Sequence, residues 1–482
     1  MKLNELLQGL EILSANADLE SDITGVSYDS RTTAEGDLFV AVTGYAVDGH
    51  RFIPMAKEKG AAVVLCEKIP EVDIPYVQVA NSRRGLAVLG LNWFGHPAKE
   101  MTMVAVTGTN GKTTTTYLLK SILEQNLGAK VGLIGTNQNM IGDEVIPTER
   151  TTPESFEVQR LFRRMADAGC SHVVMEVSSH ALCEDRVYGV HFDFGIFTNL
   201  TQDHLDFHGT MEEYCDAKAR LFRLCDTGIC NADDVWTERL LKDATCKKFF
   251  FAENAAADLR AENCELAADH IAYDAVSGEG STHIHVPIPG GFTVYNTLGV
   301  LAAAKALGVP YEKSAATLAG VGGVKGRVEV VPTPGRDYTI LIDYAHSPDG
   351  LENVLRSAKG FARGRVVALF GCGGDRDATK RPIMGRIAAE LADFVIVTSD
   401  NPRTEEPMAI IRDILPGMEG TDTPYVVVEN RVEAIHYAID HAQSGDVIVL
   451  AGKGHETYQI IGTEKHHLDE REVVADYLRA RR

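Results

Sequence analysis

The chain has 482 residues, of which 45% are hydrophobic and 24% are charged, and its formal net charge is −21. This length is more than one hydrophobic core supports, so we expect about three domains. The negative charge argues against sequence-independent binding to nucleic acid, which needs surface lysine and arginine. No uncharged apolar run approaches the roughly 20 residues of a membrane span, and the nine cysteines form no C-x-x-C pair. We therefore expect a cytoplasmic protein with reduced thiols and no membrane insertion.

The N-terminal part of the chain alternates short β-rich runs with helical stretches. Residues 1–13 predict an amphipathic helix rather than a signal peptide. Strands are predicted at 37–42 (DLFVAV), 61–66 (AAVVLC) and 75–80 (PYVQVA). Gly and Pro in NWFGHPAKEM, residues 92–101, then interrupt the pattern. We place a first α/β domain at 1–98.

Two further α/β series follow. The strand patterns MTMVAVT, KVGLIG, HVVMEV and FGIFTN are separated by helices predicted at 112–127 and near 154–168, which implies parallel strands with crossover helices. A Gly- and Pro-rich segment at 320–337 precedes YTILIDY, RVVALFG, FVIVTS, PYVVVE and DVIVLAG, the strands of a doubly wound sheet. The predicted fold class is α/β, with a central P-loop-type parallel-sheet domain at 99–328 and a C-terminal Rossmann-like domain at 329–482.

Residues 104–116, VAVTGTNGKTTTT, predict a strand, a glycine turn and the start of a helix. Val106 stands where the usual loop G-x-x-x-x-G-K-[ST] has its first glycine, so this phosphate cradle is shorter than that of kinases. Gly108 and Gly111 allow backbone amides to approach phosphate oxygens closely. Lys112 would supply a charge to the outer phosphates, and the Thr113 hydroxyl suits Mg²⁺.

Three further side chains are candidates for chemistry. Glu176 ends the strand pattern HVVMEV, and His204 follows FGIFTN, so both are expected at the carboxyl edge of the sheet, where ligands bind. The spacing H-x-x-x-H at 204 and 208 lacks the glutamate of H-E-x-x-H, which excludes a zinc protease. Spacing alone predicts that Lys218 is an exposed lysine on an amphipathic helix.

Several motifs in a fixed order resemble one family over almost the whole chain. They are VSYDSR, GTNGKT, EVSSH, TNLTQDHLDFHG, YCDAKARLF, GRVE, DYAHSPDGLE, GCGGDRDATKRP, SDNPRTEEP and AGKGHETYQ. The family is the Mur ligases, the ATP-dependent amide ligases of peptidoglycan precursor synthesis. Within it, the motifs are similar to those of the enzymes that add the third residue of the stem peptide. The resemblance implies that ATP phosphorylates a carboxylate of UDP-MurNAc-L-Ala-D-Glu, and that an amine attacks the acyl phosphate.

The resemblance also implies roles for particular residues, and we expect the enzyme to act as a monomer on small molecules. Catalytic positions would be Lys112, Glu176, His204 and Lys218. ATP would contact Gly108, Thr109, Asn110, Gly111, Lys112, Thr113, Thr114, Asn296, Arg327, Asp343 and His346. One Mg²⁺ would be held by Thr113 and Glu176, and a second by Glu176, His204 and Lys218, the last as a carbamate derived from CO₂. The nucleotide-sugar peptide would contact Ser30, Thr151, Thr152, Ser178 and Arg186, and the incoming amino acid Arg376, Asp400, Asn401, Pro402, Arg403, Gly452 and Glu456.

Two positions depart from the family pattern. Val328 replaces the usual methionine of GRME but leaves Arg327 in place. Glu184 stands where some members have glutamine, and we leave it out of the predicted site.

SDNPR, residues 399–403, resembles the pattern of relatives that add meso-diaminopimelate rather than lysine. The Arg403 guanidinium can bind the second carboxylate of diaminopimelate through two hydrogen bonds, whereas lysine would leave this arginine unpaired.

Other functions remain open at this point. SDNPR disfavours a lysine-adding relative, and the N-terminal VSYDSR domain disfavours a ligase similar to folylpolyglutamate synthetase. Lys218 together with DNPR disfavours a P-loop kinase. A nucleotide-binding scaffold without activity would not need Lys112, Glu176, His204 and Lys218 together.

Overall fold

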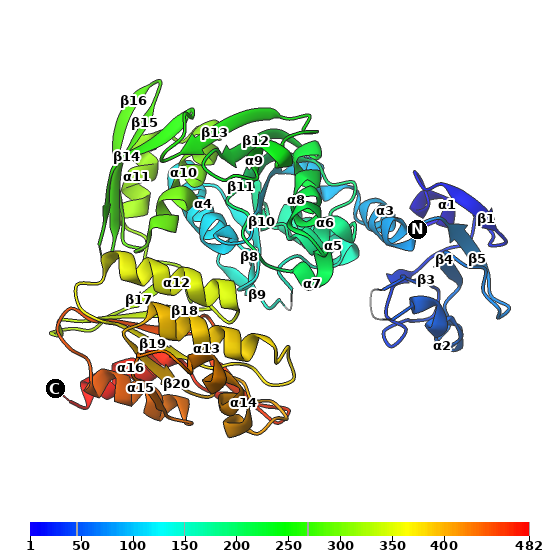
Figure 1. Cartoon of the computed structure of the whole chain (residues 1–482). Helices are drawn as coiled ribbons and strands as arrows, with labels where there is room; N and C mark the ends of the chain where they lie inside the picture. The colour runs from blue at the N-terminus through cyan, green and yellow to red at the C-terminus, as the bar shows by residue number, and fades with distance from the viewer. Residues whose placement is uncertain (45–46, 149, 268, 482) are drawn as a thin grey trace.

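A computed structural model describes residues 1–44, 47–148, 150–267 and 269–481. These residues form three large sheets and a separate two-stranded hairpin, each sheet with its own helices (Figure 1). The predicted fold class, α/β in three domains, is confirmed. In the described part of the chain, no helix is both long and apolar enough to cross a membrane. All nine cysteines, which fall within the described ranges, are free thiols.

The N-terminal sheet has the strand order β1-β5-β4-β3-β2, with β1 antiparallel to β5 and the other neighbours parallel. Its strands are β1 (Ile12–Ala15), β2 (Gly25–Ser27), β3 (Asp37–Val40), β4 (Val63–Cys66) and β5 (Tyr76–Val79), and its helices are α1 (Leu3–Leu6), α2 (Ile53–Glu58) and α3 (Ser82–Phe94). The helix predicted over 1–13 is wrong beyond Leu6. Gly9 takes a left-handed φ of 85°, which favours ending a helix, and Ile12 then pairs with Val79.

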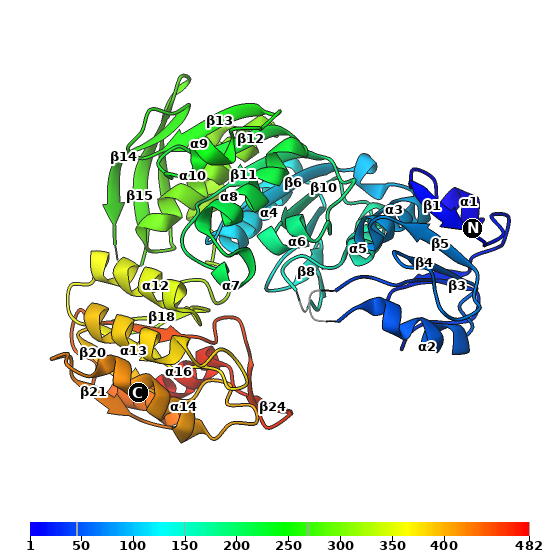
Figure 2. The same cartoon turned by 45° about the vertical axis from the view of Figure 1, so that its right-hand side comes forward.

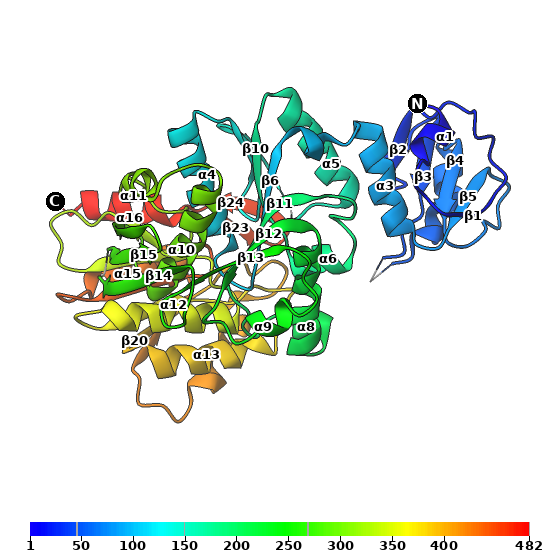
Figure 3. The ribbon, with the colours of Figure 1, turned by 90° about the horizontal axis from the view of Figure 1, so that it is seen from above.

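Helix α3 joins the N-terminal sheet to the central domain by packing against α5 (Ser155–Asp167), as Figures 1 and 3 show. The ring centroids of Phe94 and Phe156 lie 5.1 Å apart. A Cβ on Gly90 would come within 3.3 Å of Phe156, so this glycine allows the two helices to approach closely.

The central sheet has the order β16-β15-β14-β13-β12-β11-β6-β10-β7-β8-β9 and is parallel from β7 to β14. Its strands are β6 (Thr102–Thr107), β7 (Val131–Ile134), β8 (Asn139–Ile141), β9 (Glu144–Ile146), β10 (His172–Glu176), β11 (Phe192–Phe197), β12 (Cys225–Asn231), β13 (Lys247–Ala252), β14 (Leu259–Leu266), β15 (Ile271–Ser277) and β16 (Gly280–Val286). Its other helices are α4 (Lys112–Leu127), α6 (Ser179–Cys183), α7 (Leu205–His208), α8 (Met211–Ala219), α9 (Thr237–Leu240), α10 (Gly291–Ala306) and α11 (Tyr311–Ala319). The antiparallel extension β14–β16 was not predicted.

The C-terminal sheet has the order β17-β18-β22-β19-β20-β21 and contains all five predicted strands. Its strands are β17 (Glu329–Val331), β18 (Thr339–Asp343), β19 (Val366–Phe370), β20 (Phe394–Val397), β21 (Tyr425–Val427) and β22 (Val447–Ala451), and the hairpin is β23 (Tyr458–Ile461) and β24 (Glu464–His467). The helices are α12 (Pro348–Phe361), α13 (Lys380–Leu391), α14 (Pro407–Ile414), α15 (Arg431–Asp440) and α16 (Glu470–Arg479). Helix α12 lies on the side that faces the central domain (Figure 2).

A fully buried ion pair connects α15, α16 and the end of β22. The Arg431 Nε donates to Glu470 Oε1 at 2.8 Å, and its Nη2 donates to the Ala451 carbonyl at 2.9 Å. Replacing Arg431 with alanine would leave the Glu470 carboxylate buried and unpaired.

We expect Arg431→Ala to lower the free energy of unfolding by about 3–5 kcal/mol, because breaking a buried pair leaves an uncompensated charge. Urea unfolding followed by circular dichroism measures this change. The control is Arg479→Ala on the exposed side of α16, expected within about 0.5 kcal/mol of the wild type. If the two variants unfold at the same urea concentration, the buried pair does not stabilise the domain.

Candidate functional site

The phosphate loop connects β6 to α4, and its two glycines are required by their surroundings. Gly108 has φ 150° and Gly111 has φ 84°. A Cβ on Gly108 would lie 1.9 Å from Thr198 Oγ1, and one on Gly111 would lie 2.1 Å from Asn296 Oδ1. Larger residues therefore do not fit at either position. The predicted loop is present, and Asn296 on α10 lies directly against it.

Lys112 begins α4, and its ammonium folds back onto the loop. Its Nζ donates to the carbonyls of Gly108 and Thr109 at 2.9 and 2.7 Å. Burial lowers the pKa of Lys112, while the nearby Glu176 carboxylate raises it. The charge that would meet an outer phosphate is thus held inside the cradle by backbone carbonyls.

Lys218 on α8 is buried, with 1% exposure, so the surface position predicted from spacing is wrong. Its Nζ donates to the Gly108 carbonyl at 2.9 Å and lies 4.5 Å from the centre of the Tyr214 ring. Burial, and then the neighbouring ammonium of Lys112, hold the pKa of Lys218 well below its usual value. The site thus keeps two lysine ammonium groups within hydrogen-bond distance of the Gly108 carbonyl.

Glu176 and Thr113 supply buried oxygens next to this loop. The Glu176 carboxylate ends β10 and accepts hydrogen bonds from the Thr136 backbone N at 3.0 Å and the Thr136 Oγ1 at 2.9 Å. The Thr113 Oγ1 accepts from Arg327 Nη2 at 3.4 Å. His204 lies further out, with a side chain 45% exposed beside Asp203 and its ring 4.9 Å from that of His180. Within the described residues, no group of three or more His, Cys, Asp or Glu side chains is arranged to hold a metal ion.

A cavity of about 310 Å³ lies between the phosphate loop and the C-terminal domain. Its lining includes most of the predicted nucleotide positions: Thr109, Asn110, Gly111, Lys112, Thr114, Asn296, Arg327, Asp343 and His346. Of the other predicted residues, Thr151 and His204 also line it, whereas Gly108 and Thr113 do not. The cavity therefore brings together side chains that are far apart in sequence.

Two residues of this cavity region were missed by the sequence analysis, although both belong to the motif DYAHSPDGLE. The Tyr344 ring lies 5.2 Å from the Arg327 guanidinium, within the range of a cation–π interaction. The Asp349 Oδ2 accepts from Asn110 Nδ2 at 3.1 Å and from Thr201 Oγ1 at 3.3 Å. Asp349 thereby connects the C-terminal domain directly to the phosphate loop.

The predicted sugar-peptide residues of the central domain lie together. The Thr152 Oγ1 accepts from the Ser178 backbone N at 3.1 Å, and Arg186 Nη1 donates to the Thr152 carbonyl at 2.9 Å. Glu184, which was left out, lies 2.5 Å from Arg186 and 3.5 Å from Arg83 on α3. It is therefore part of an ion cluster that spans two domains.

Ser30 is separate from this group. It is buried in the N-terminal domain, where its Oγ lies 3.3 Å from the Met55 sulfur. Its neighbours Tyr28 and Asp29 line a cavity of about 490 Å³, together with Arg150 and other residues of the central domain.

The predicted amino-acid residues gather around the loop that follows β20. The Asn401 Nδ2 donates to Glu456 Oε2 at 3.0 Å. Arg403 has a left-handed φ of 52°, and its Nη1 donates to the Gly374 carbonyl at 2.8 Å. A Cβ on Gly452 would lie 2.6 Å from Asp400 Oδ2.

Pro402 and Arg376 are the two remaining residues of the predicted amino-acid site. Pro402 is buried, and its carbonyl oxygen would lie 1.9 Å from a Cβ on Gly374. Arg376 is exposed on the neighbouring loop, where its Nη1 donates to the Asp375 carbonyl at 3.0 Å. Its guanidinium is thus available to a ligand.

The predicted amino-acid residues lie close to the nucleotide cavity at Tyr344. Burial, and then the charge of the Glu456 carboxylate, raise the pKa of Tyr344 to about 12, and Asp400 adds to this effect. Because Tyr344 also lines the nucleotide cavity, a phosphorylated group in the cavity and an amine in the pocket would be neighbours.

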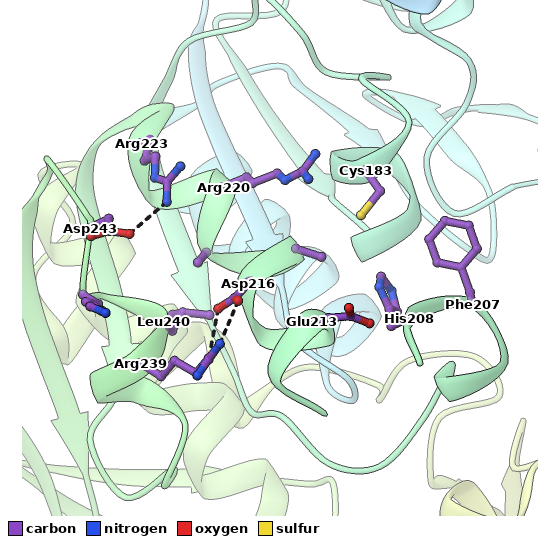
Figure 4. Close-up of a pocket in the computed structure, with 13 residues that line it drawn as sticks. Cys183, Phe207, His208, Glu213, Asp216, Arg220, Arg223, Arg239, Leu240 and Asp243 are labelled. Carbon is purple, nitrogen blue, oxygen red and sulfur yellow. Dashed lines mark hydrogen bonds and ion pairs between the residues drawn. The ribbon is translucent and has the colours of Figure 1, made fainter. Parts of the chain in front are cut away.

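A separate cavity of about 580 Å³ lies on the outer face of α8 and contains none of the predicted site residues (Figure 4). Two of its arginines are paired within it: Arg239 donates to both oxygens of Asp216 at 2.9 and 2.8 Å, and Arg223 to Asp243 at 3.3 Å. Asp216 is two residues from Lys218 and so points to the opposite side of the helix.

The fold and the site define a P-loop enzyme whose nucleotide cavity is completed by a second, Rossmann-like domain. The chain belongs to the Mur ligase family. Three family models match it: the Mur ligase family catalytic domain at 22–91, the Mur ligase middle domain at 106–304, and the Mur ligase glutamate ligase domain at 326–454.

Individual relatives match almost the whole chain. It is 47% identical to the UDP-N-acetylmuramoyl-L-alanyl-D-glutamate--2,6-diaminopimelate ligase of Clostridium tetani, over 99% of each chain. It is also 47% identical to ligase 1 of the same name from Clostridium acetobutylicum, again over 99% of each chain. A solved structure of a ligase with this name is 31% identical, with a TM-score of 0.72 over 100% of this chain and 99% of that one.

Proposed function

We propose that the chain joins meso-2,6-diaminopimelate to the D-glutamate of UDP-MurNAc-L-Ala-D-Glu, with ATP, in cytoplasmic peptidoglycan precursor synthesis. The observation that carries this proposal is the position of Tyr344, which lines the P-loop cavity and lies close enough to Glu456 and Asp400 for their charges to raise its pKa. Glu456 in turn accepts a hydrogen bond from Asn401 of the SDNPR segment. The names of the relatives at 47% identity support the choice of substrates.

The reaction would proceed through an acyl phosphate. The D-glutamate carboxylate attacks the γ-phosphorus of ATP, and the bond to the bridging oxygen breaks to release ADP. The amine of diaminopimelate then attacks the acyl carbon, loses a proton, and expels inorganic phosphate. Lys112, the amides at the start of α4 and Arg327 would neutralise the charge on the transferred phosphoryl group.

Mg²⁺ fits the residues present, because Thr113 and Glu176 offer a hydroxyl and a carboxylate, the oxygen ligands that Mg²⁺ prefers. We infer that these two residues would hold one Mg²⁺, and that Glu176, His204 and a modified Lys218 would hold a second. When bound, the metal would neutralise phosphate charge.

We also infer that Lys218 is carbamylated. Its buried amine has a strongly lowered pKa, so the neutral form is available to attack CO₂. The nitrogen–carbon bond forms and one proton leaves to solvent, which converts the neutral amine into an anionic oxygen ligand.

The domain roles follow from these assignments. Residues 1–98 would bind the nucleotide-sugar end through Ser30, residues 99–328 would bind ATP, and residues 329–482 would bind the incoming amino acid. Thr151, Thr152, Ser178 and Arg186 would contact the peptide end. We propose that the enzyme acts as a monomer, since each predicted residue set is supplied by one chain.

Phosphate release with ATP, Mg²⁺ and UDP-MurNAc-L-Ala-D-Glu tests the proposal, with meso-diaminopimelate and L-lysine offered in separate reactions. We expect strong release with diaminopimelate only. Release with lysine instead would favour the lysine-adding alternative and overturn the assigned specificity. Release with neither amino acid would overturn the proposed reaction.

A further inference from the structure

Lys453 lies beneath the amino-acid pocket, and no role in the proposed reaction has been assigned to it. It follows β22 in the segment AGKGHE and is fully buried, with 0% exposure. Its Nζ donates to Asn401 Oδ1 at 2.9 Å and to Glu456 Oε2 at 2.9 Å. A buried ammonium is rare unless its charge is compensated, so the placement of this lysine beside two pocket residues suggests a function.

The charged side chains of the segments SDNPR and AGKGHE balance one another. Arg403 and Lys453 contribute two positive charges, and Asp400 and Glu456 contribute two negative charges. The Arg431–Glu470 ion pair beneath them, with Arg431 Nη1 3.9 Å from Asp400 Oδ2, adds no net charge.

We propose that Lys453 sets the charge balance of this pocket and thereby selects an amino acid whose far end carries both a carboxylate and an ammonium. This inference rests on the proposed function. The far end of diaminopimelate has no net charge and matches a neutral surrounding. The far end of lysine brings one uncompensated positive charge into a site where charges are poorly screened.

Without Lys453 the same surrounding would carry one net negative charge, which favours lysine over diaminopimelate. The near ends of the two amino acids are identical, so a charge facing that end does not discriminate between them. Lys453 therefore acts through the sum of the charges, whereas Arg403 acts by direct contact with the second carboxylate.

The same contacts position the specificity loop. The Asn401 Oδ1 that accepts from Lys453 also accepts from the Ile460 backbone N at 2.9 Å. The Arg403 backbone N donates to the Ile460 carbonyl at 3.1 Å, and Gln459 Nε2 donates to the Asp400 carbonyl at 2.6 Å. Lys453 and the β23–β24 hairpin thus support the loop from below, and Glu456 keeps only its Oε1 for a ligand ammonium.

The test compares kcat/KM for diaminopimelate and for L-lysine in the full-length enzyme and in Lys453→Met, which retains the length of the side chain but not its charge. We expect the ratio of the two values to move toward lysine by about tenfold or more, with the KM for ATP unchanged. Lys453→Arg retains the charge and should keep the ratio within about threefold of the wild type.

A double variant separates charge balance from general damage. In Lys453→Met/Glu456→Gln the pocket is again neutral, so the ratio should return toward that of the wild type even though both substrates bind more weakly. This variant also removes the unpaired buried carboxylate, so it supplies the result if the single variant does not fold.

Two results would overturn the inference about Lys453 and leave the proposed function in place. One is an equal loss for both amino acids in Lys453→Met, which indicates a purely structural role. The other is a ratio of kcat/KM values that moves toward lysine as far in the double variant as in the single variant. Absence of phosphate release by the wild type with both amino acids is a different outcome, because it overturns the proposed function and this inference together.

Discussion

Lys218→Ala is expected to lower the rate of amide formation by about 10²–10³ or more. The lysine is buried against the Gly108 carbonyl of the phosphate loop, and alanine can neither form a carbamate nor offer an oxygen to a metal. Loss of one preorganised charge-stabilising group has an effect of this size. The measurement is amine-dependent phosphate release at saturating substrates.

Short carboxylic acids such as acetate should partly restore activity to Lys218→Ala, because they can occupy the place of the carbamate. The matched control is Lys242→Ala, an exposed lysine of the same domain, which should retain wild-type activity. Full activity of Lys218→Ala without added acid would contradict the assignment of Lys218 as a metal ligand.

Arg403→Ala is expected to raise the KM for diaminopimelate and to reduce its preference over lysine by about 10³. The guanidinium is held near the loop at 373–374 through its bond to the Gly374 carbonyl, and its left-handed backbone is fixed by hydrogen bonds to the hairpin. It is therefore prepared to bind a carboxylate through two hydrogen bonds. Steady-state kinetics with each amino acid in turn provides the measurement.

Arg386→Ala on α13 serves as the control for Arg403→Ala, since this arginine is exposed and belongs to no predicted site. Arg386→Ala should leave the KM and kcat for both amino acids unchanged. Unchanged discrimination in Arg403→Ala would place the determinant elsewhere, with Arg376 as the next residue to replace.

Much of the fold could be predicted from local patterns. The helix predicted at 112–127 coincides with α4, and the five parallel strands of the C-terminal sheet were all found because buried parallel strands form continuous apolar runs. The antiparallel edge strand β17 was not predicted. The segment β14–β16 was missed because its exposed face is polar. The hairpin β23–β24 was missed for the same reason, since β24 is exposed throughout.

The site was predicted less completely, because its contacts join distant parts of the chain. The phosphate loop was predicted from the spacing of its glycines and Lys112. The role of Lys218 came from the family resemblance, because the helical pattern around it predicted an exposed side chain. The pairing of Asp349 with Asn110 and that of Lys453 with Asn401 each connect separate segments. Each becomes visible only when the three-dimensional structure places the segments side by side.

The contact between Asp349 and the phosphate loop has a consequence for how nucleotide affinity should be interpreted. Since neither domain alone builds the cavity, a nucleotide binds fully only to molecules in which the two domains are together. Its apparent dissociation constant equals the intrinsic constant divided by the fraction of molecules in that state. A tenfold change in that fraction would change the apparent affinity tenfold without altering any nucleotide contact, so affinity measures the domain equilibrium as well as the site.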